Sequence, residues 1–310
     1  IESKKHKIKS NFFCDWEIYR NKYCSIKKNR KNLYKLSNKY DFQIRDIKEI
    51  TNRINPVLTI EDVGMKDIIL SNEVQKFYSI NYSGDFINNY QSYKNKFENI
   101  FMLSEYFTNY YECNDEKNLF FGSPKFDVNL DNKDIFKKYK LKKDQKYALV
   151  FYPRKRDINK IKIRNIYSLL RSNGYKLIIK TRGKDPIYNF FNRGDFYFVD
   201  DSWYPHISLE LIKISEIVIN FGSAAIEECV MMNTPVIDFN IKPFEKIFKS
   251  LYEYKFVKNF ESQFKEKEFK EAINYLVRSD FKKEFNKAQE KNLFNNNFKS
   301  SQKILKFILK

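Results

Sequence analysis

The sequence is poor in glycine, histidine and cysteine: its 310 residues include seven glycines, two histidines and four cysteines. No two cysteines form a CxxC pair, and the histidines, His6 and His206, lie far apart in the chain. A structural zinc site needs about four clustered Cys or His ligands. We therefore expect no metal site. Four scattered cysteines in a chain of this length are typical of reduced thiols in a cytosolic protein.

Long apolar runs are also missing. The longest fall far short of the ~20 residues that a membrane-spanning helix needs, and no signal peptide is recognisable. The chain starts at Ile1 rather than Met, so we expect the N-terminal domain to be truncated. We expect a cytoplasmic protein that meets the inner face of the membrane, if at all, through charge and exposed aromatic side chains.

Acidic residues are outnumbered by basic ones, 39 to 58, which gives a net charge of +19. Such a chain is attracted to polyanions, including nucleic acids, nucleotides and anionic membrane surfaces. The lysines are spread along the whole sequence, without an aromatic-flanked RNA-binding motif or a Cys/His finger. We therefore expect no specific nucleic-acid partner. The hydrophobic content of 42% is enough for the core of one large or two medium domains.

Apolar runs of strand length alternate with segments of helical spacing, which predicts α/β domains with parallel sheets covered on both faces. Predicted strands of a first series are 56–62, 77–82, 100–104 and 119–121. Predicted strands of a second series are 147–152, 175–180, 196–199, 217–219 and 236–237. We place the domain boundary in the polar stretch between them. This predicts domains at 1–130 and 131–310, with short helices and loops over 1–50 and aromatic-rich helices after residue 240.

The stretch 216–240, EIVINFGSAAIEECVMMNTPVIDFN, has the pattern strand, tight turn, helix, strand. Small residues at the turn, Gly222, Ser223 and Ala224, allow a phosphate to approach backbone N–H groups at a helix N-terminus. Glu228 follows about a turn and a half into the helix, where a carboxylate can accept hydrogen bonds from a ribose diol. An ordinary βαβ crossover with solvent-facing glutamates fits the local pattern equally well.

Basic residues follow neighbouring strands of the second series. Arg154 and Arg156 come after the first strand, and Lys180 and Arg182 come at or after the end of the second. The carboxyl ends of parallel strands meet at one edge of the sheet, where such cations can neutralise a diphosphate. A single basic loop is expected by chance in so basic a chain, but convergence with the glycine turn favours a nucleotide site.

The loop after residue 200 offers two further candidates. Trp203 can stack on a nucleobase, and His206 can be a hydrogen-bond partner of the nucleotide. The alternative for Trp203 is a cap on the hydrophobic core.

Catalytic candidates in the first series are acids at strand ends. Asp85 follows a glycine turn and is the first choice for a general base, followed by Glu105 and Asp62. The alternatives are that Asp85 caps the next helix and that Glu105 is a plain surface acid.

The stretch INFGSAAIEECVMMNTPVIDFN resembles the sugar-nucleotide signature of GT-B glycosyltransferases and of UDP-N-acetylglucosamine 2-epimerase. In that signature a turn of small residues binds the diphosphate, and a glutamate seven residues before a proline binds the ribose. The resemblance assigns these roles to Ser223 and Ala224 and to Glu228, seven residues before Pro235. Asn233-Thr234 stands where the family commonly has glycine.

Two other segments, FFGSPKFD (120–127) and LVFYPRKRD (149–157), resemble bacterial surface-polysaccharide transferases and glycerophosphotransferases. The family often ends a strand of the first domain with His-Gly, whereas this chain has Asn81-Tyr82-Ser83-Gly84. The acid/base residue is therefore left open by the resemblance.

The resemblance implies a GT-B enzyme, with two doubly wound Rossmann-like domains facing a cleft, the acceptor on the N-terminal domain and the donor on the C-terminal one. It implies a metal-independent glycosyltransferase without a cofactor, which moves a sugar from a nucleotide-sugar to a glycan or lipid-linked acceptor for capsule, lipopolysaccharide or a similar surface glycan. The alternatives are a CDP-glycerol or ribitol-type polyol-phosphate transferase, a sugar-nucleotide 2-epimerase and a non-catalytic polyanion-binding protein. The sequence leaves open the nucleotide, the sugar, the acceptor, the stereochemistry and the oligomeric state.

Overall fold

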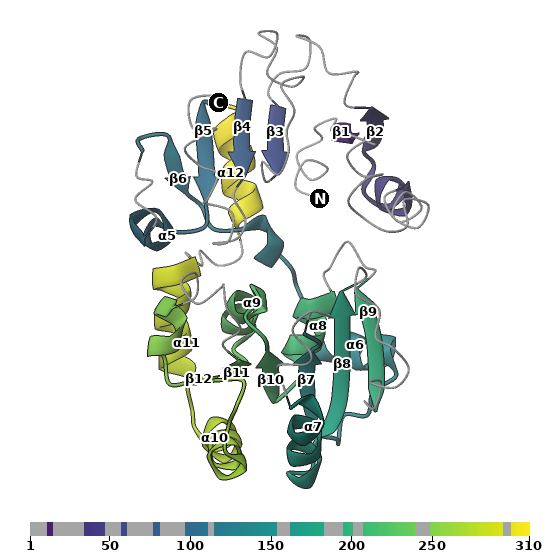
Figure 1. The fold of residues 1–310 in the computed structure, drawn as a ribbon. Coiled ribbons are helices and arrows are strands. Elements are labelled where there is room, and N and C mark those ends of the chain that lie inside the picture. Colours follow the sequence, from purple (N-terminus) through teal and green to yellow (C-terminus); the bar gives the residue numbers. More distant parts are fainter. Residues whose placement is uncertain are drawn as a thin grey trace. The chain divides into compact units, whose positions relative to one another are not determined.

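The computed structural model forms two compact units, residues 1–128 with 290–310, and residues 129–289 (Figure 1). The residues that the structure describes are 11–14, 34–46, 57–60, 77–80, 97–110, 115–153, 162–182, 195–200, 207–239, 249–293 and 299–310. Each unit is an α/β structure built on a parallel sheet.

The second unit contains a six-stranded sheet in the order β12-β11-β10-β7-β8-β9, in which every neighbouring pair is parallel. Its strands are β7 (Tyr147–Phe151), β8 (Lys176–Arg182), β9 (Phe196–Asp200), β10 (Ile217–Asn220), β11 (Val236–Phe239) and β12 (Val257–Phe260). From β7 the chain adds strands in one direction, and from β10 it adds them in the other. This reversal is the topological switch point of a doubly wound sheet, and it lies between β7 and β10.

Helices cover both faces of this sheet because right-handed crossovers change face where the strand order reverses. They are α6 (Asn132–Tyr139), α7 (Ile163–Ser172), α8 (Ile207–Lys213), α9 (Ala225–Met232), α10 (Glu266–Arg278) and α11 (Lys282–Ala288), with the shorter turn η9 (Lys249–Glu253). The turn η10 (Gln289–Leu293) begins at the last residue of this unit and continues into the first unit. The α6, α8 and α9 helices contact one another in series, and α10 contacts β10. Glu210 of α8 accepts hydrogen bonds from Lys138 and Tyr139 of α6, which ties the two helices together.

The central strands of the second unit are buried along their whole length, as expected for a sheet covered on both faces. An aromatic cluster forms part of this core: the Phe239 ring stacks on Phe221 at 5.2 Å and contacts the rings of Phe260, Phe264 and Phe269. This packing fixes the end of β11 next to the turn that follows β10.

The first unit contains a four-stranded parallel sheet in the order β3-β4-β5-β6 and a separate parallel pair, β1-β2. Its elements are β1 (Asn11–Cys14), β2 (Gln43–Asp46), β3 (Val57–Ile60), β4 (Phe77–Ile80), β5 (Asn99–Met102), α5 (Glu105–Tyr110), β6 (Asn118–Phe120), η5 (Pro124–Phe126) and α12 (Ser300–Ile308).

The C-terminal helix α12 belongs to this first unit (Figure 1). Ile304 packs with Tyr78 and Phe101 in its core, and the Phe307 ring lies 5.7 Å from that of Phe101. The Asp127 carboxylate accepts the backbone N–H groups at the start of α12, so it caps the helix. The sequence predicts a second domain over all of 131–310, whereas in the structure residues 290–310 belong to the first unit. The reason is that both the capping carboxylate and the apolar partners of the last helix lie in the first unit.

Every strand predicted from the sequence overlaps an observed strand. The predictions for 1–50 and for the region after 240 were wrong in part, because they contained only helices and loops. The structure has β1 and β2 in the first region and β12 in the second. In the described segments no helix is long and apolar enough to cross a membrane.

Candidate nucleotide site

The turn after β10 lies at the carboxyl edge of the six-stranded sheet, beside the switch point. Ligands of open α/β sheets bind at this place, because the connections diverge there and leave a crevice. The turn comprises Phe221 to Ala224 and leads directly into α9. It is therefore the candidate nucleotide site of the second unit.

Glycine is required in this turn. Gly222 has φ 58°, in the left-handed region where a side chain is strained. Its backbone N–H donates to Asp238 Oδ1 at 2.9 Å. This N–H is therefore directed into the protein and is not available to a phosphate.

The Ser223 hydroxyl is also used inside the protein. It donates to Asn220 Oδ1 at 2.6 Å, while Asn220 Nδ2 donates to the Ser223 carbonyl oxygen at 3.0 Å. The Ala225 N–H approaches the same hydroxyl oxygen at 3.4 Å. The side chain of Ser223 thus stabilises the turn, and what it offers to a ligand is its backbone.

Two backbone N–H groups of the turn remain available. No described residue accepts a hydrogen bond from the N–H of Ser223 or Ala224, and both residues are partly exposed. They lie at the N-terminus of α9, where Ala224 is the N-cap residue and provides no capping side chain. Unpaired N–H groups and the positive end of the helix dipole together favour an anion.

Both glutamates of α9 are buried, Glu227 with none of its surface exposed and Glu228 with 8%. The interpretation that these glutamates face solvent was therefore wrong. Glu228 lies one helical turn beyond the N–H groups of the turn. The fully buried Cys229 thiol beside it has its pKa raised by burial first, then by Glu228 and by Asp238. Such a thiol stays protonated and is no nucleophile.

Asp238, at the end of β11, is a member of this site that the sequence did not reveal. Its carboxylate is fully buried and accepts hydrogen bonds from Gly222 N, from Asn220 Nδ2 at 2.9 Å and from Tyr252 OH at 2.8 Å. In the described part of the chain no Lys or Arg pairs with it. Burial therefore raises its pKa to about 6, against the lowering effect of the three hydrogen bonds. The one available signal was an acid inside the otherwise apolar strand VIDF.

The predicted basic cluster is placed differently from expectation. Strand β8 continues through Arg182, so both Lys180 and Arg182 belong to the strand instead of the loop after it. Lys180 is only 4% exposed, and its Nζ lies 5.2 Å from the centre of the Phe151 ring. This cation–π contact holds its side chain in a buried position near the carboxyl end of β8.

The structure brings together four of the predicted site residues: Gly222, Ser223, Ala224 and Glu228. Other predicted residues lie outside the described segments, namely Asp62, Asp85, Arg154, Arg156, Trp203 and His206. Glu105 is exposed in the first turn of α5, in the first unit. Among the side chains that the structure describes, no three His, Cys, Asp or Glu residues are grouped to hold a metal ion.

Hydroxyl groups gather on the α7 side of the same sheet edge. Thr181 Oγ1 and Tyr197 OH are 3.1 Å apart. The hydroxyls of Tyr152 and Tyr167 are buried without a hydrogen-bond partner among the described groups. Burial, and then the nearby Tyr197, raises the pKa of Tyr152 to about 12, so its phenol stays neutral.

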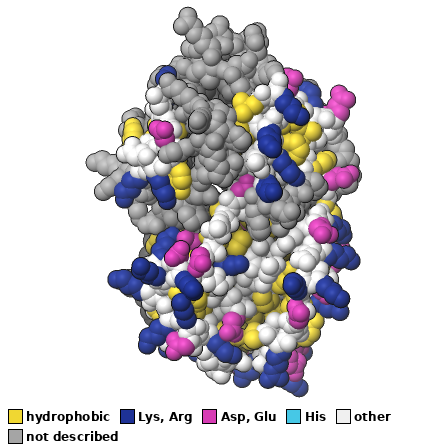
Figure 2. Space-filling model, turned by 180° about the vertical axis from the view of Figure 1, so that it is seen from behind, with side chains coloured by type: hydrophobic (Ala, Val, Ile, Leu, Met, Phe, Trp, Pro, Cys, Tyr) yellow, Lys and Arg dark blue, Asp and Glu magenta, His cyan; other side chains and the backbone are white. Residues whose placement is uncertain are grey.

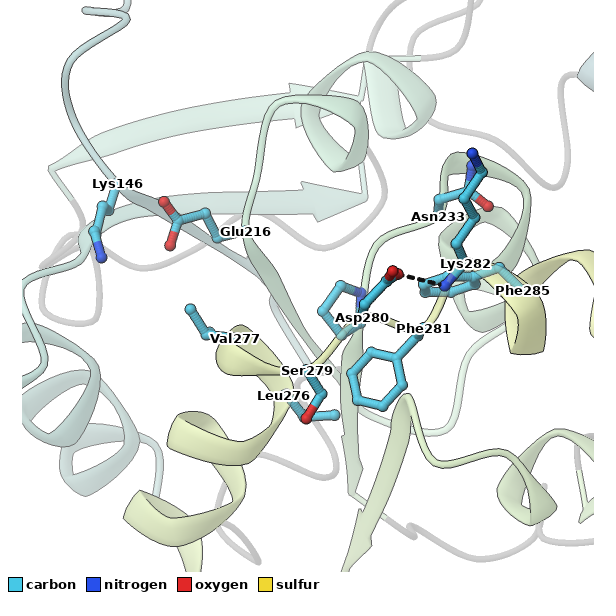
Figure 3. A pocket seen from close by; sticks show the side chains of 11 residues that line it. Lys146, Glu216, Asn233, Leu276, Val277, Ser279, Asp280, Phe281, Lys282 and Phe285 are labelled. Atoms are coloured by element: carbon cyan, nitrogen blue, oxygen red, sulfur yellow. Dashed lines mark hydrogen bonds between the residues drawn. The ribbon is translucent and has the colours of Figure 1, made fainter.

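A cavity of about 520 Å³ lies at the other end of the strands, where their amino ends meet (Figure 3). Its lining includes Lys146, Glu216 and Pro235, which precede β7, β10 and β11 respectively. Figure 3 also shows the Asp280 carboxylate accepting the backbone N–H of Lys282 at its rim. Because it adjoins the amino ends of the strands, this cavity is separate from the candidate nucleotide site.

No protein-family model and no curated protein matches the sequence. Solved structures do match. A variant of the wall teichoic acid polymerase TagF, soaked with CDPG, has a TM-score of 0.62 at 16% identity, over 97% of this chain and 88% of that one. MnaA of S. aureus with UDP has a TM-score of 0.56 at 15% identity, over 90% and 86% of the two chains.

The UDP-GlcNAc 2-epimerase of Methanocaldococcus jannaschii, in complex with UDP-GlcNAc and UDP, has a TM-score of 0.51 at 12% identity, over 76% of this chain and 69% of that one. At these identities the similarity concerns the fold. The chain therefore has a GT-B-like α/β fold, which confirms the predicted fold class.

Proposed function

We propose that this protein is a glycosyltransferase that takes a sugar from a nucleoside-diphosphate donor and transfers it to a hydroxyl of a bacterial surface glycan. One observation carries the proposal. The N–H groups of Ser223 and Ala224 are available at the start of α9, beside the switch point of a doubly wound sheet. This arrangement suits the diphosphate of such a donor.

In this proposal the diphosphate accepts hydrogen bonds from the two N–H groups, and Glu228 accepts them from the ribose hydroxyls. Arg154 and Arg156 are assigned to the charge that develops on the leaving diphosphate. Hydrogen-bond donors and cations that are already in position are effective because they need no reorganisation during the reaction.

The acceptor hydroxyl needs a base, for which Asp85, Glu105 and Asp62 remain the candidates. The scheme requires no metal ion, because the helix N-terminus and the arginines provide the positive charge.

A polyol-phosphate transferase is the second candidate. It is favoured by the similarity to TagF, whose TM-score of 0.62 over 97% of this chain exceeds those of MnaA and of the UDP-GlcNAc 2-epimerase reported above. The two reactions break different bonds. Glycosyl transfer breaks the bond between the sugar and the diphosphate and releases a nucleoside diphosphate. Polyol-phosphate transfer breaks the bond between the two phosphates and releases a nucleoside monophosphate.

The surface charge is consistent with an anionic acceptor or with the inner face of the membrane. On the face that Figure 2 shows, Lys and Arg side chains are scattered over the described parts of both units, with Asp and Glu between them. A diffuse basic surface raises the local concentration of an anionic partner without selecting its sequence.

Thermal unfolding with UDP, CDP, GDP and CMP tests the proposal. A specific site predicts that one nucleobase raises the melting temperature more than the others, because only the folded state binds it. Equal stabilisation by all four and by inorganic polyphosphate would instead indicate a polyanion-binding protein. An absence of any response would contradict both transferase proposals. The released nucleotide, identified by chromatography, then separates the two reactions.

A further inference from the structure

Asp238 connects three segments of the second unit through its carboxylate. Oδ1 accepts from Gly222 N and from Asn220 Nδ2, both at 2.9 Å, and Oδ2 accepts from Tyr252 OH of η9 at 2.8 Å. Asn220 in turn holds Ser223 by two hydrogen bonds. A single buried carboxylate therefore fixes the whole turn and determines which N–H groups stay available to a ligand.

The groups that the structure describes around Asp238 leave its charge uncompensated. The titratable ones are the phenol of Tyr252 and, on α9, the thiol of Cys229, with Glu227 and Glu228 directly before it in the helix. None of these is cationic.

The neighbouring strands add only neutral groups on this face. The register partners of Asp238 are Asn220 on β10 and Asn259 on β12. The ammonium group of Lys258 is occupied elsewhere, since its Nζ lies 4.4 Å from the centre of the Tyr275 ring. Among the described groups, hydrogen bonds alone stabilise a negative charge on Asp238.

We propose that Asp238 is a positioning residue for the donor diphosphate, and that the diphosphate binds preferentially when the Asp238 carboxyl is protonated. This inference rests on the function proposed above. The diphosphate would bind the N–H groups of the two residues that directly follow Gly222, whose own N–H contacts Asp238. Because the Asp238 carboxylate is buried, it and an anion so close to it repel each other strongly. Binding of the diphosphate therefore takes up a proton.

The consequence is a pH-dependent affinity. Asp238 titrates near pH 6 in the ligand-free protein, and a bound diphosphate raises its pKa further. The dissociation constant should therefore rise as the pH increases through 6, about tenfold for each unit by which the ligand raises this pKa. By thermodynamic linkage, protonation of Asp238 tightens ligand binding by the same factor by which the bound ligand favours protonation of Asp238.

Isothermal titration between pH 5.5 and 8 tests the inference with two probes, UDP-GlcNAc and CDP-glycerol. Both carry an esterified diphosphate, so the probe itself does not titrate in this range. For wild type we expect weaker binding at high pH and net proton uptake. Asp238→Asn should bind with the affinity of wild type at low pH and show no such dependence.

Tyr252→Phe provides a signature that a merely structural role would not give. The hydroxyl of Tyr252 lowers the pKa of Asp238, so its removal should move the midpoint of the affinity profile to higher pH. Tyr275→Phe is the matched control, because this partly exposed tyrosine of α10 does not contact Asp238, and the midpoint should not move.

Two results would overturn the inference: the same pH dependence in wild type and Asp238→Asn, or an Asp238→Asn variant that is folded but binds at no pH. Failure of the proposed function looks different. In that case neither probe produces binding heat with wild type at any pH, and the inference falls with it.

Discussion

Asn220 and Ser223 hold each other by two hydrogen bonds of opposite direction. The Ser223 hydroxyl donates to Asn220 Oδ1 at 2.6 Å, and Asn220 Nδ2 donates to the Ser223 carbonyl at 3.0 Å. The same Nδ2 also donates to Asp238. One amide thus joins the end of β10, the turn and the end of β11, and it does so from a fully buried position.

Asn220→Ala should lower the free energy of unfolding by roughly 2 kcal/mol, since it leaves buried polar partners unpaired. The nucleotide that the thermal panel identifies should also bind more weakly, because the turn loses its support. Chemical denaturation and titration measure the two effects. Asn259→Ala on β12 removes an exposed amide and should change stability by less than about 0.5 kcal/mol. Equal effects at the two positions would show that the amide of Asn220 has no special role.

Glu228→Gln should reduce nucleotide affinity about tenfold, because an amide is a weaker acceptor for ribose hydroxyls than a carboxylate. Glu227→Gln is the matched control on the same helix. Its side chain is completely buried and cannot touch a ligand, so the variant should keep its affinity even if its stability changes. An unchanged dissociation constant in Glu228→Gln would remove this residue from the ribose site.

The sequence predicted the strands and the turn because their signals are local. Buried strands are continuous apolar runs, and Gly222 takes a left-handed conformation that glycine favours. Asn233 shows the same principle. It stands where the resembling family commonly has glycine, and it adopts φ 56° at the end of α9, a conformation that Asn tolerates better than most residues.

The missed features depend on residues that are distant in the sequence. Asp238 gains its role through Asn220 and Tyr252, which lie 18 and 14 residues away and meet it only in the folded sheet. Only one residue of strand β12 is buried, Val257, and the strand is identified by its pairing with β11. The amphipathic pattern of α12 indicates a helix with one apolar face, but it does not say which sheet that face covers.

Asp238 should make stability depend on pH. Its pKa is about 6 in the folded protein, whereas the ordinary pKa of an aspartate is 3.8, so the folded state holds more protons between these two values. The stabilising contribution is complete below pH 3.8 and is lost as the pH rises through 6, by roughly 3 kcal/mol in total. Denaturation of wild type and Asp238→Asn at several pH values measures the difference, which should favour the variant increasingly up to about pH 7. A constant difference would mean that Asp238 has an ordinary pKa.

Tyr167→Phe should leave the protein equally stable or more stable, by up to about 1 kcal/mol. The Tyr167 hydroxyl is buried and has no hydrogen-bond partner among the described groups, so its desolvation is not repaid. The melting temperature measures the effect. Tyr147→Phe is the contrasting variant, because the Tyr147 hydroxyl bonds with Lys142 and Gln145 and its loss should destabilise. A clear loss of stability in Tyr167→Phe would indicate that a buried water or a ligand normally occupies the site.

Ile304→Ala on α12 should destabilise the first unit by about 3 kcal/mol, because it opens a cavity in a core shared with Tyr78 and Phe101. Hydrogen exchange localises the effect better than a global melt. Amides of β4 and β5 should exchange faster, whereas those of β10 and β11, in the second unit, should keep their protection. Leu309→Ala is the control, since this side chain is 52% exposed and should change neither. Faster exchange in β10 and β11 instead would show that the C-terminal helix supports the second unit, as the domain division expected from the sequence implies.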